Sequence, residues 1–153
     1  MSGTWGRPIA EFTTGREQSL ARAAAGEFET LLKEYLPLIV HPDRLADAAL
    51  VGPLLDMQRR AGRETLLRNM RAYHVDDDSR PLLALIRVPT FVLAVRDDRF
   101  LPIAEQQFLT GAIATARMAV IDDCGHCAAM ERPQAVTALL RYWLSYSDIR
   151  EKV

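Results

Sequence analysis

Residues that could do chemistry gather near the carboxyl end of the chain. Residues 124–127 read Cys-Gly-His-Cys, and a pair of aspartates, Asp97 and Asp98, ends 28 positions before His126. A carboxylate that accepts a hydrogen bond from one imidazole nitrogen leaves the other nitrogen to take a proton from a nucleophile. Two cysteines separated by two residues are instead the pattern of dithiol oxidoreductases. The sequence thus offers two chemistries, proton transfer by histidine and thiol exchange.

Three elements predicted around these residues would position them. The segment "VPTFVLAV" (88–95) is a short apolar run entered through a proline, which is typical of a strand buried on both faces of a parallel sheet. The segment "LPIAEQQFLTGAI" (101–113) predicts a helix with a proline at its start, and "RMAVID" (117–122) predicts a second strand. Since parallel neighbours need a crossover of about a dozen residues or more, we expect a βαβ unit.

The loops that follow the two predicted strands leave the sheet at the same edge. Ligands of open α/β sheets usually bind at this carboxyl edge, and adjacent strands lie about 4.8 Å apart. We therefore expect either Asp97 or Asp98 to contact His126.

The first half of the chain has helical periodicity from Glu11 to about Tyr73. One apolar stripe is formed by Phe28, Leu31, Leu32, Tyr35 and Leu36. We expect Gly52-Pro53 to kink a helix or to divide it in two. The polar, acidic stretch "HVDDDSRP" (74–81) predicts a linker.

The end of the chain, "RPQAVTALLRYWLS" (132–145), predicts a closing helix with a proline near its start. Its expected apolar face consists of Val136, Leu139, Leu140, Trp143 and Leu144.

Composition narrows the possible partners. The 153 residues are 49% hydrophobic and 25% charged, as is typical of a single globular domain. A net charge of -1 gives no reason to expect nucleic acid or an anionic membrane as a partner. No apolar run reaches about 20 residues and no secretory signal is recognisable, so we expect a cytoplasmic protein whose two cysteines stay as thiols.

Two motifs in this order resemble the α/β-hydrolase fold superfamily. Its small-ester and lactone hydrolases, such as carboxylesterases and 3-oxoadipate enol-lactonases, commonly carry "VPTLVLxGxDDxxxP" and then "GHxxxxExP". This chain reads "VPTFVLAVRDDRFLP" (88–102) and "GHCAAMERP" (125–133). The resemblance implies an α/β fold that is the carboxyl-terminal half of this architecture. It would comprise an amino-terminal segment (1–10), a helical cap (11–78) and a βαβα part of the core (79–153).

The resemblance also implies roles for individual residues. Asp98 matches the catalytic acid of a Ser-His-Asp triad and His126 matches its histidine, while Glu131 matches the entry of the last helix. Asp97 is a substitute acid, because Val95 stands where the superfamily usually has glycine and the turn can differ in shape. The expected substrate is a small ester, a lactone or a related acyl compound, with no cofactor and no metal.

The nucleophile of the triad is missing from the sequence. The superfamily presents a serine as G-x-S-x-G, and none of the five serines has glycines two residues to either side. We expect the 153 residues alone to hydrolyse no ester. A sheet that starts at residue 88 leaves an unpaired apolar edge, so we expect a homo-oligomer or a partner that carries the amino-terminal half.

Two other classes of function stay open at this point. One is a non-catalytic binding or assembly protein derived from a hydrolase. The other is a Cys-x-x-Cys thiol oxidoreductase, against which stand the acidic residues Asp122 and Asp123, because they raise a neighbouring thiol pKa. Zinc binding by these cysteines would need a second ligand pair, which the sequence does not show.

Overall fold

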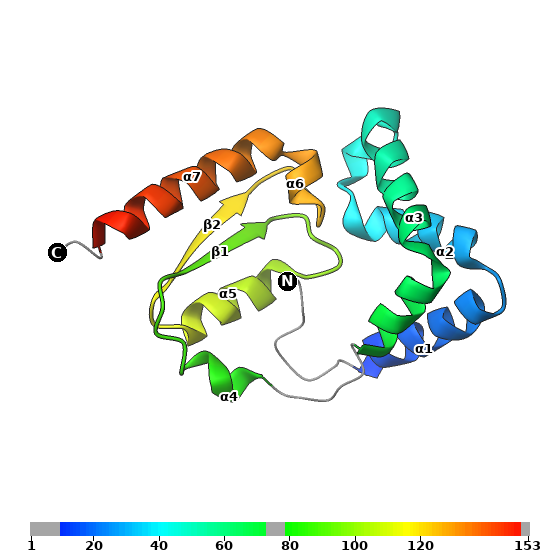
Figure 1. The fold of residues 1–153 in the computed structure, drawn as a ribbon, viewed down its shortest axis with the longest axis horizontal. Coiled ribbons are helices and arrows are strands. Elements are labelled where there is room, and N and C mark those ends of the chain that lie inside the picture. Colours follow the sequence, from blue (N-terminus) through cyan, green and yellow to red (C-terminus); the bar gives the residue numbers. More distant parts are fainter. Residues whose placement is uncertain (1–9, 73–78, 151–153) are drawn as a thin grey trace.

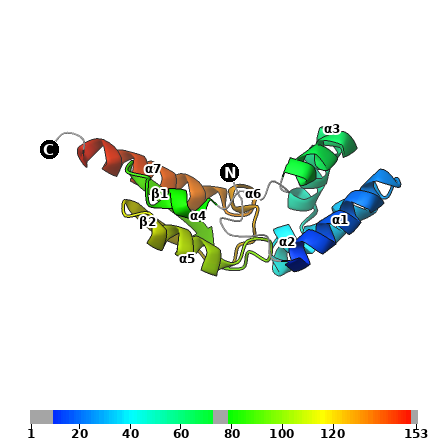
Figure 2. The same ribbon diagram turned by 90° about the horizontal axis from the view of Figure 1, so that it is seen from below.

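The structure, a computed structural model, describes residues 10–72 and 79–150 and has a helical part beside a part with a small sheet (Figure 1). In chain order the elements are α1 (Ala10–Ala24), α2 (Phe28–Ile39), the 3-10 helix η1 (Pro42–Arg44), α3 (Ala48–Ala72), α4 (Arg80–Leu83), β1 (Thr90–Val95), α5 (Ile103–Ala112), β2 (Ala116–Ile121), α6 (Ala128–Glu131) and α7 (Pro133–Arg150). Figure 2 shows α1, α2 and α3 grouped at one end of the molecule and the strands with α4 to α7 at the other. The predicted fold class, a helical segment followed by a βαβα unit, is therefore confirmed.

The predicted domain boundaries fall largely outside the described residues. The amino-terminal segment (1–10) has only its last residue described, and of the linker (74–81) only 79–81 are described. Arg80 and Pro81 already belong to α4. The division into a cap (11–78) and a core part (79–153) stays a prediction.

The helical part packs through the stripe that the sequence predicts. Leu31 and Leu32 of α2 are buried, and α2 lies against both α1 and α3. Of the two outcomes expected at Gly52-Pro53, a kink or a division, the division is wrong. The helix α3 continues through both residues, and its non-helical residue is Gly62, at φ 80° and ψ 163°. Proline keeps a helical φ, so a helix can continue through it although it loses one hydrogen bond and gains a clash with the preceding turn. The φ and ψ of Gly62, in contrast, are accessible almost only to glycine.

The two strands form a parallel pair, as predicted. Thr90 pairs with Ala116 and the register runs unbroken to Val95 and Ile121. Successive side chains of a strand point to opposite faces, so the two faces have separate cores. Val92 packs with α5 on one face and Val95 packs with α7 on the other.

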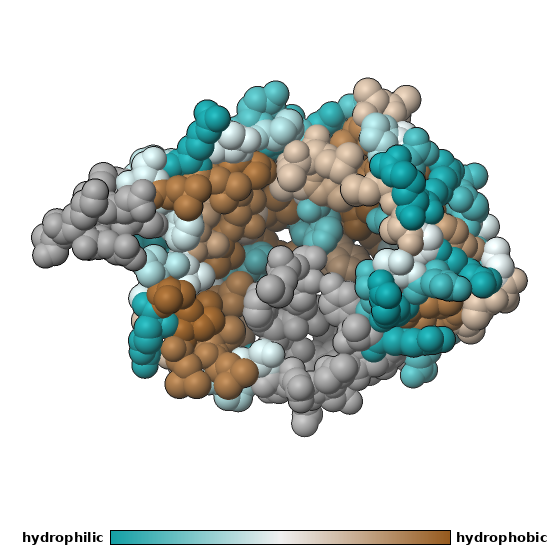
Figure 3. Space-filling view, viewed as in Figure 1, coloured by the Kyte–Doolittle hydropathy of each residue, from teal (hydrophilic) through white to brown (hydrophobic). Residues whose placement is uncertain are grey.

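Apolar side chains are exposed on the face shown in Figure 3, over α4 and along α7. Around α4 these are Leu82, Leu85 and Val88, with 60%, 66% and 66% of their surface exposed. The apolar face predicted for α7 is only partly covered, since the helix packs on the sheet through Ala135, Val136 and Leu139. Leu140 and Leu144 stay exposed.

Within the described residues, none of the helices has both the length and the apolar character needed to cross a bilayer.

The break in α3 leads to a paired prediction. Gly62→Ala should lower the free energy of unfolding by about 1–3 kcal/mol, because alanine is strained at this backbone conformation. Gly111→Ala lies within the helix α5 and has nothing within 4 Å of the added Cβ, so it should raise that free energy by about 0.5–1 kcal/mol. Urea unfolding followed by circular dichroism measures both changes. Equal effects of the two substitutions would contradict the assigned break.

Candidate active site

The loop after β1 holds the side chain of Asp98 rigidly. One carboxylate oxygen, Oδ1, accepts hydrogen bonds from the backbone N–H groups of Phe100 (2.8 Å) and Leu101 (2.7 Å). The side chain is only 6% exposed. Local bonds of this kind are characteristic of aspartate in turns, and here they fix the direction of the second oxygen, Oδ2.

The loop after β2 brings His126 to that second oxygen. Nδ1 of His126 lies 2.8 Å from Oδ2 of Asp98, and the imidazole is 21% exposed. The Phe100 ring packs on the imidazole with the ring centroids 5.0 Å apart. The contact that the sequence predicts between an aspartate and His126 is thus present, and the residue that makes it is Asp98.

This contact determines which imidazole nitrogen carries the proton. An ionised carboxylate can only accept hydrogen bonds, so Nδ1 of His126 must be the donor. In the neutral ring Nε2 is then an unprotonated acceptor, and this is the nitrogen that can take a proton from a hydroxyl. An imidazole held in this way is able to act as a general base.

Asp97, the substitute acid, contacts a different histidine, His41. Its carboxylate oxygen Oδ2 lies 3.7 Å from Nε2 of His41, which belongs to the turn between α2 and η1. Its backbone N–H donates to the carbonyl of Cys124 (3.2 Å), which ties the loop after β1 to the loop after β2. The two adjacent aspartates therefore contact two different histidines.

A set of possible metal ligands surrounds His41. His41, Asp97 and Asp123 each offer a ligand atom, and these atoms lie within 4.8 Å of one another. However, Nδ1 of His41 accepts a hydrogen bond from the backbone N–H of Asp43 (3.3 Å), which leaves the proton on Nε2. A protonated nitrogen cannot bind a metal, so the arrangement favours a polar contact with Asp97 over a ligand set.

The two cysteines beside His126 lie in different apolar clusters. Cys124 is fully buried with Val95 and Ile121, whereas Cys127 packs against the cluster of Val40 and Leu54. Burial, followed by the charge of Glu131, raises the pKa of each thiol to about 11. A catalytic dithiol needs a lowered thiol pKa, so the environment of this pair does not support thiol exchange.

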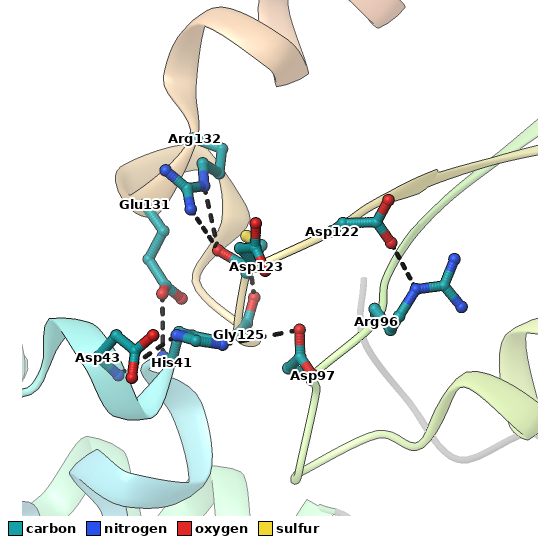
Figure 4. Close-up of polar contacts among 10 residues, drawn as sticks. His41, Asp43, Arg96, Asp97, Asp122, Asp123, Gly125, Glu131 and Arg132 are labelled. Atoms are coloured by element: carbon teal, nitrogen blue, oxygen red, sulfur yellow. Dashed lines mark hydrogen bonds and ion pairs between the residues drawn. The ribbon is translucent and has the colours of Figure 1, made fainter.

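The structure adds a cluster that the sequence reasoning missed. Glu131 is only 2% exposed, and its oxygen Oε2 accepts a hydrogen bond from the backbone N–H of His41 (2.9 Å). The guanidinium of Arg44 donates to the backbone carbonyl of Glu131. Figure 4 shows Glu131, from the end of α6, and Asp97, from the loop after β1, reaching His41 with Gly125 beside them. The contacting residues are 90 positions apart in the sequence, and no local pattern marks them.

Comparison with solved structures identifies the fold. A malate-bound thermophilic esterase from Thermogutta terrifontis is similar with a TM-score of 0.84 and 23% identity, over 93% of this chain and 53% of the esterase. An enol-lactonase from Burkholderia xenovorans has a TM-score of 0.76 and 24% identity, again over 93% of this chain and 53% of the lactonase. A putative non-heme bromoperoxidase from Mycobacterium tuberculosis has a TM-score of 0.70 and 20% identity, over 93% and 55%.

Comparison of sequences finds a shorter similarity than comparison of structures. No protein-family profile matches the chain. A curated relative, monoacylglycerol lipase ABHD6 from Bos taurus, is 33% identical over 55 residues, which are 36% of this chain and 16% of the lipase. The chain thus spans about half the length of the solved structures and a small part of the lipase. The predicted resemblance is confirmed at the level of fold: the chain has the α/β-hydrolase fold, of which it forms about half.

The buried thiols provide a test by chemical modification. With a pKa of about 11, each thiol is about 100-fold less ionised at pH 8 than an ordinary cysteine, and the thiolate is the reacting form. Ellman's reagent at pH 8 should therefore modify the folded chain at least about 100-fold more slowly than the chain in urea. The rate in the folded state should rise with pH toward 11. Fast modification of one cysteine at pH 7 would contradict this account and would favour thiol chemistry.

Proposed function

We propose that this chain supplies the acid and the histidine of a Ser-His-Asp triad that hydrolyses a small ester, a lactone or a related acyl substrate. The observation that carries the proposal is the 2.8 Å contact between Nδ1 of His126 and the doubly anchored carboxylate of Asp98. The α/β-hydrolase fold supports it, because both residues follow parallel strands at the carboxyl edge where ligands of such sheets bind.

In this mechanism Nε2 of His126 takes the proton of a serine hydroxyl as the oxygen attacks the acyl carbon. Asp98 holds the ring in the required tautomer and stabilises the imidazolium that forms. The same nitrogen then returns the proton to the leaving alkoxide, and a second cycle with water releases the acid. Phe100 packs on one side of the ring and limits its rotation.

The serine and the oxyanion hole are the parts that the 153 residues do not provide. The superfamily places one oxyanion donor directly after the nucleophile and the other in an earlier loop. Our proposal therefore includes that the chain by itself has no His126-dependent esterase activity. A non-catalytic binding or assembly role is the alternative, favoured by the absence of G-x-S-x-G from this sequence.

A partner is part of the proposal. Among the described strands β1 pairs only with β2, and a two-stranded sheet is marginally stable without further cover. The exposed side chains of Leu82, Leu85 and Val88 lie just before β1. We propose that a second copy of the chain, or a polypeptide with the remaining half of the fold, covers this region.

The proposal also includes a cytoplasmic location, which agrees with both cysteines being free thiols.

The test is a chimera with the similar thermophilic esterase. The part of that esterase which this chain does not match is fused to the amino end of these 153 residues. The folded chimera should hydrolyse p-nitrophenyl acetate. Asp98→Asn should lower kcat by about 10⁴-fold, because the imidazole then adopts the wrong tautomer, and His126→Ala should abolish the activity.

The adjacent aspartate provides the matched control. Asp97→Asn changes the same charge one residue away, at a carboxylate that contacts His41, and should leave kcat within about threefold of the unmodified chimera. A folded chimera that is inactive, or one whose activity survives His126→Ala, would refute the proposed role. The same would follow if Asp97→Asn and Asp98→Asn had equal effects.

A further inference from the structure

The residues on both sides of His126 are held by one turn of the helical part. Before it, Gly125 lies so close to that turn that a Cβ at this position would stand 2.6 Å from the backbone nitrogen of His41 and 2.9 Å from the carbonyl carbon of Val40. After it, the backbone N–H of Cys127 donates to the carbonyl of Ile39 (3.1 Å). The position of the His126 backbone is therefore set by residues 39–41.

Glu131 also contacts both Gly125 and the His41 turn. The Cβ position on Gly125 is 2.9 Å from its oxygen Oε1, while its other oxygen, Oε2, binds the backbone N–H of His41. Figure 4 shows the Glu131 side chain descending from α6 to the His41 turn beside Gly125. One carboxylate thus contacts both the turn and the residue that precedes His126.

If the Glu131 side chain served only to fill space, its buried carboxylate would be unfavourable for stability. It is 98% buried by its 2% exposure, and Oε1 has no hydrogen-bond partner among the described residues. A buried polar atom without a partner is destabilising, and an apolar side chain of similar size would avoid that loss. What an apolar side chain could not do is accept the hydrogen bond from His41.

From these contacts we infer that Glu131 is a positioning residue, which locks the His41 turn against Gly125 and thereby holds His126 on Asp98. The inference deepens the proposed function and rests on it for the role of His126. The Arg44 guanidinium on the Glu131 carbonyl ties the same turn to α6. A shift of the turn would therefore move His126 relative to Asp98.

The inference predicts a change at His126 that is visible without any substrate. Glu131→Met removes the acceptor but fills most of the volume. The His41 amide should then exchange with solvent at least about tenfold faster. The Nδ1 proton of His126, slowed in exchange by its bond to Asp98, should disappear from the proton NMR spectrum. Glu131→Gln keeps one side-chain oxygen and should preserve both signals.

A matched control separates positioning from general loss of stability. Leu109→Ala truncates a buried side chain in the α5 cluster, remote from the His41 turn, and should leave the Nδ1 signal in place. The inference is overturned if Glu131→Met leaves that signal unchanged, if Leu109→Ala also removes it, or if Glu131→Gln loses it. Because no ester is present, these results do not depend on whether the chimera described above is active.

Discussion

The site depends on the parallel pairing of β1 with β2. In register, Val95 stands opposite Ile121, so the chain leaves both strands at one edge of the sheet and within a few residues reaches Asp98 and His126. An antiparallel pair would place the two loops at opposite ends. The α5 crossover makes the parallel arrangement possible, and the separate cores on the two faces hold it in place. The sheet already brings Asp98 close to His126, and the other contacts of the site adjust how the two side chains meet.

Much of this arrangement could be predicted from the sequence because its causes are local. The short apolar runs predict the strands, and the proline-initiated helix between them predicts the crossover. Together they bring Asp98 to His126 without any knowledge of the helical part. The choice between Asp97 and Asp98 was beyond such reasoning, because it depends on the hydrogen bonds that Phe100 and Leu101 donate within the loop. The resemblance favoured Asp98, and the structure adds a physical reason.

The rest depends on contacts between distant segments. Glu131 accepts a hydrogen bond from His41, which lies 90 residues earlier in the sequence, and neither residue type predicts contact with the other. The sequence predicts a kink or a division of α3 at Gly52-Pro53, its stronger helix-breaking pair, whereas the helix is divided at Gly62. The covered part of α7 likewise depends on how the helix lies on the sheet: Val136 and Leu139 pack on it and Trp143 stacks on Phe91 of β1, whereas Leu140 and Leu144 stay exposed. Periodicity identifies an apolar face but not which of its side chains the sheet covers.

The account as a whole requires that Asp98 fixes the tautomer of His126. Nitrogen-15 NMR of the uniformly labelled 153-residue chain above pH 7 measures this directly, because protonated and unprotonated imidazole nitrogens resonate at well-separated frequencies. The account predicts a proton on Nδ1 and an unprotonated Nε2, the nitrogen available to a nucleophile. A neutral His126 with its proton on Nε2 would mean that Asp98 does not accept from the ring, and the proposed general base would be contradicted.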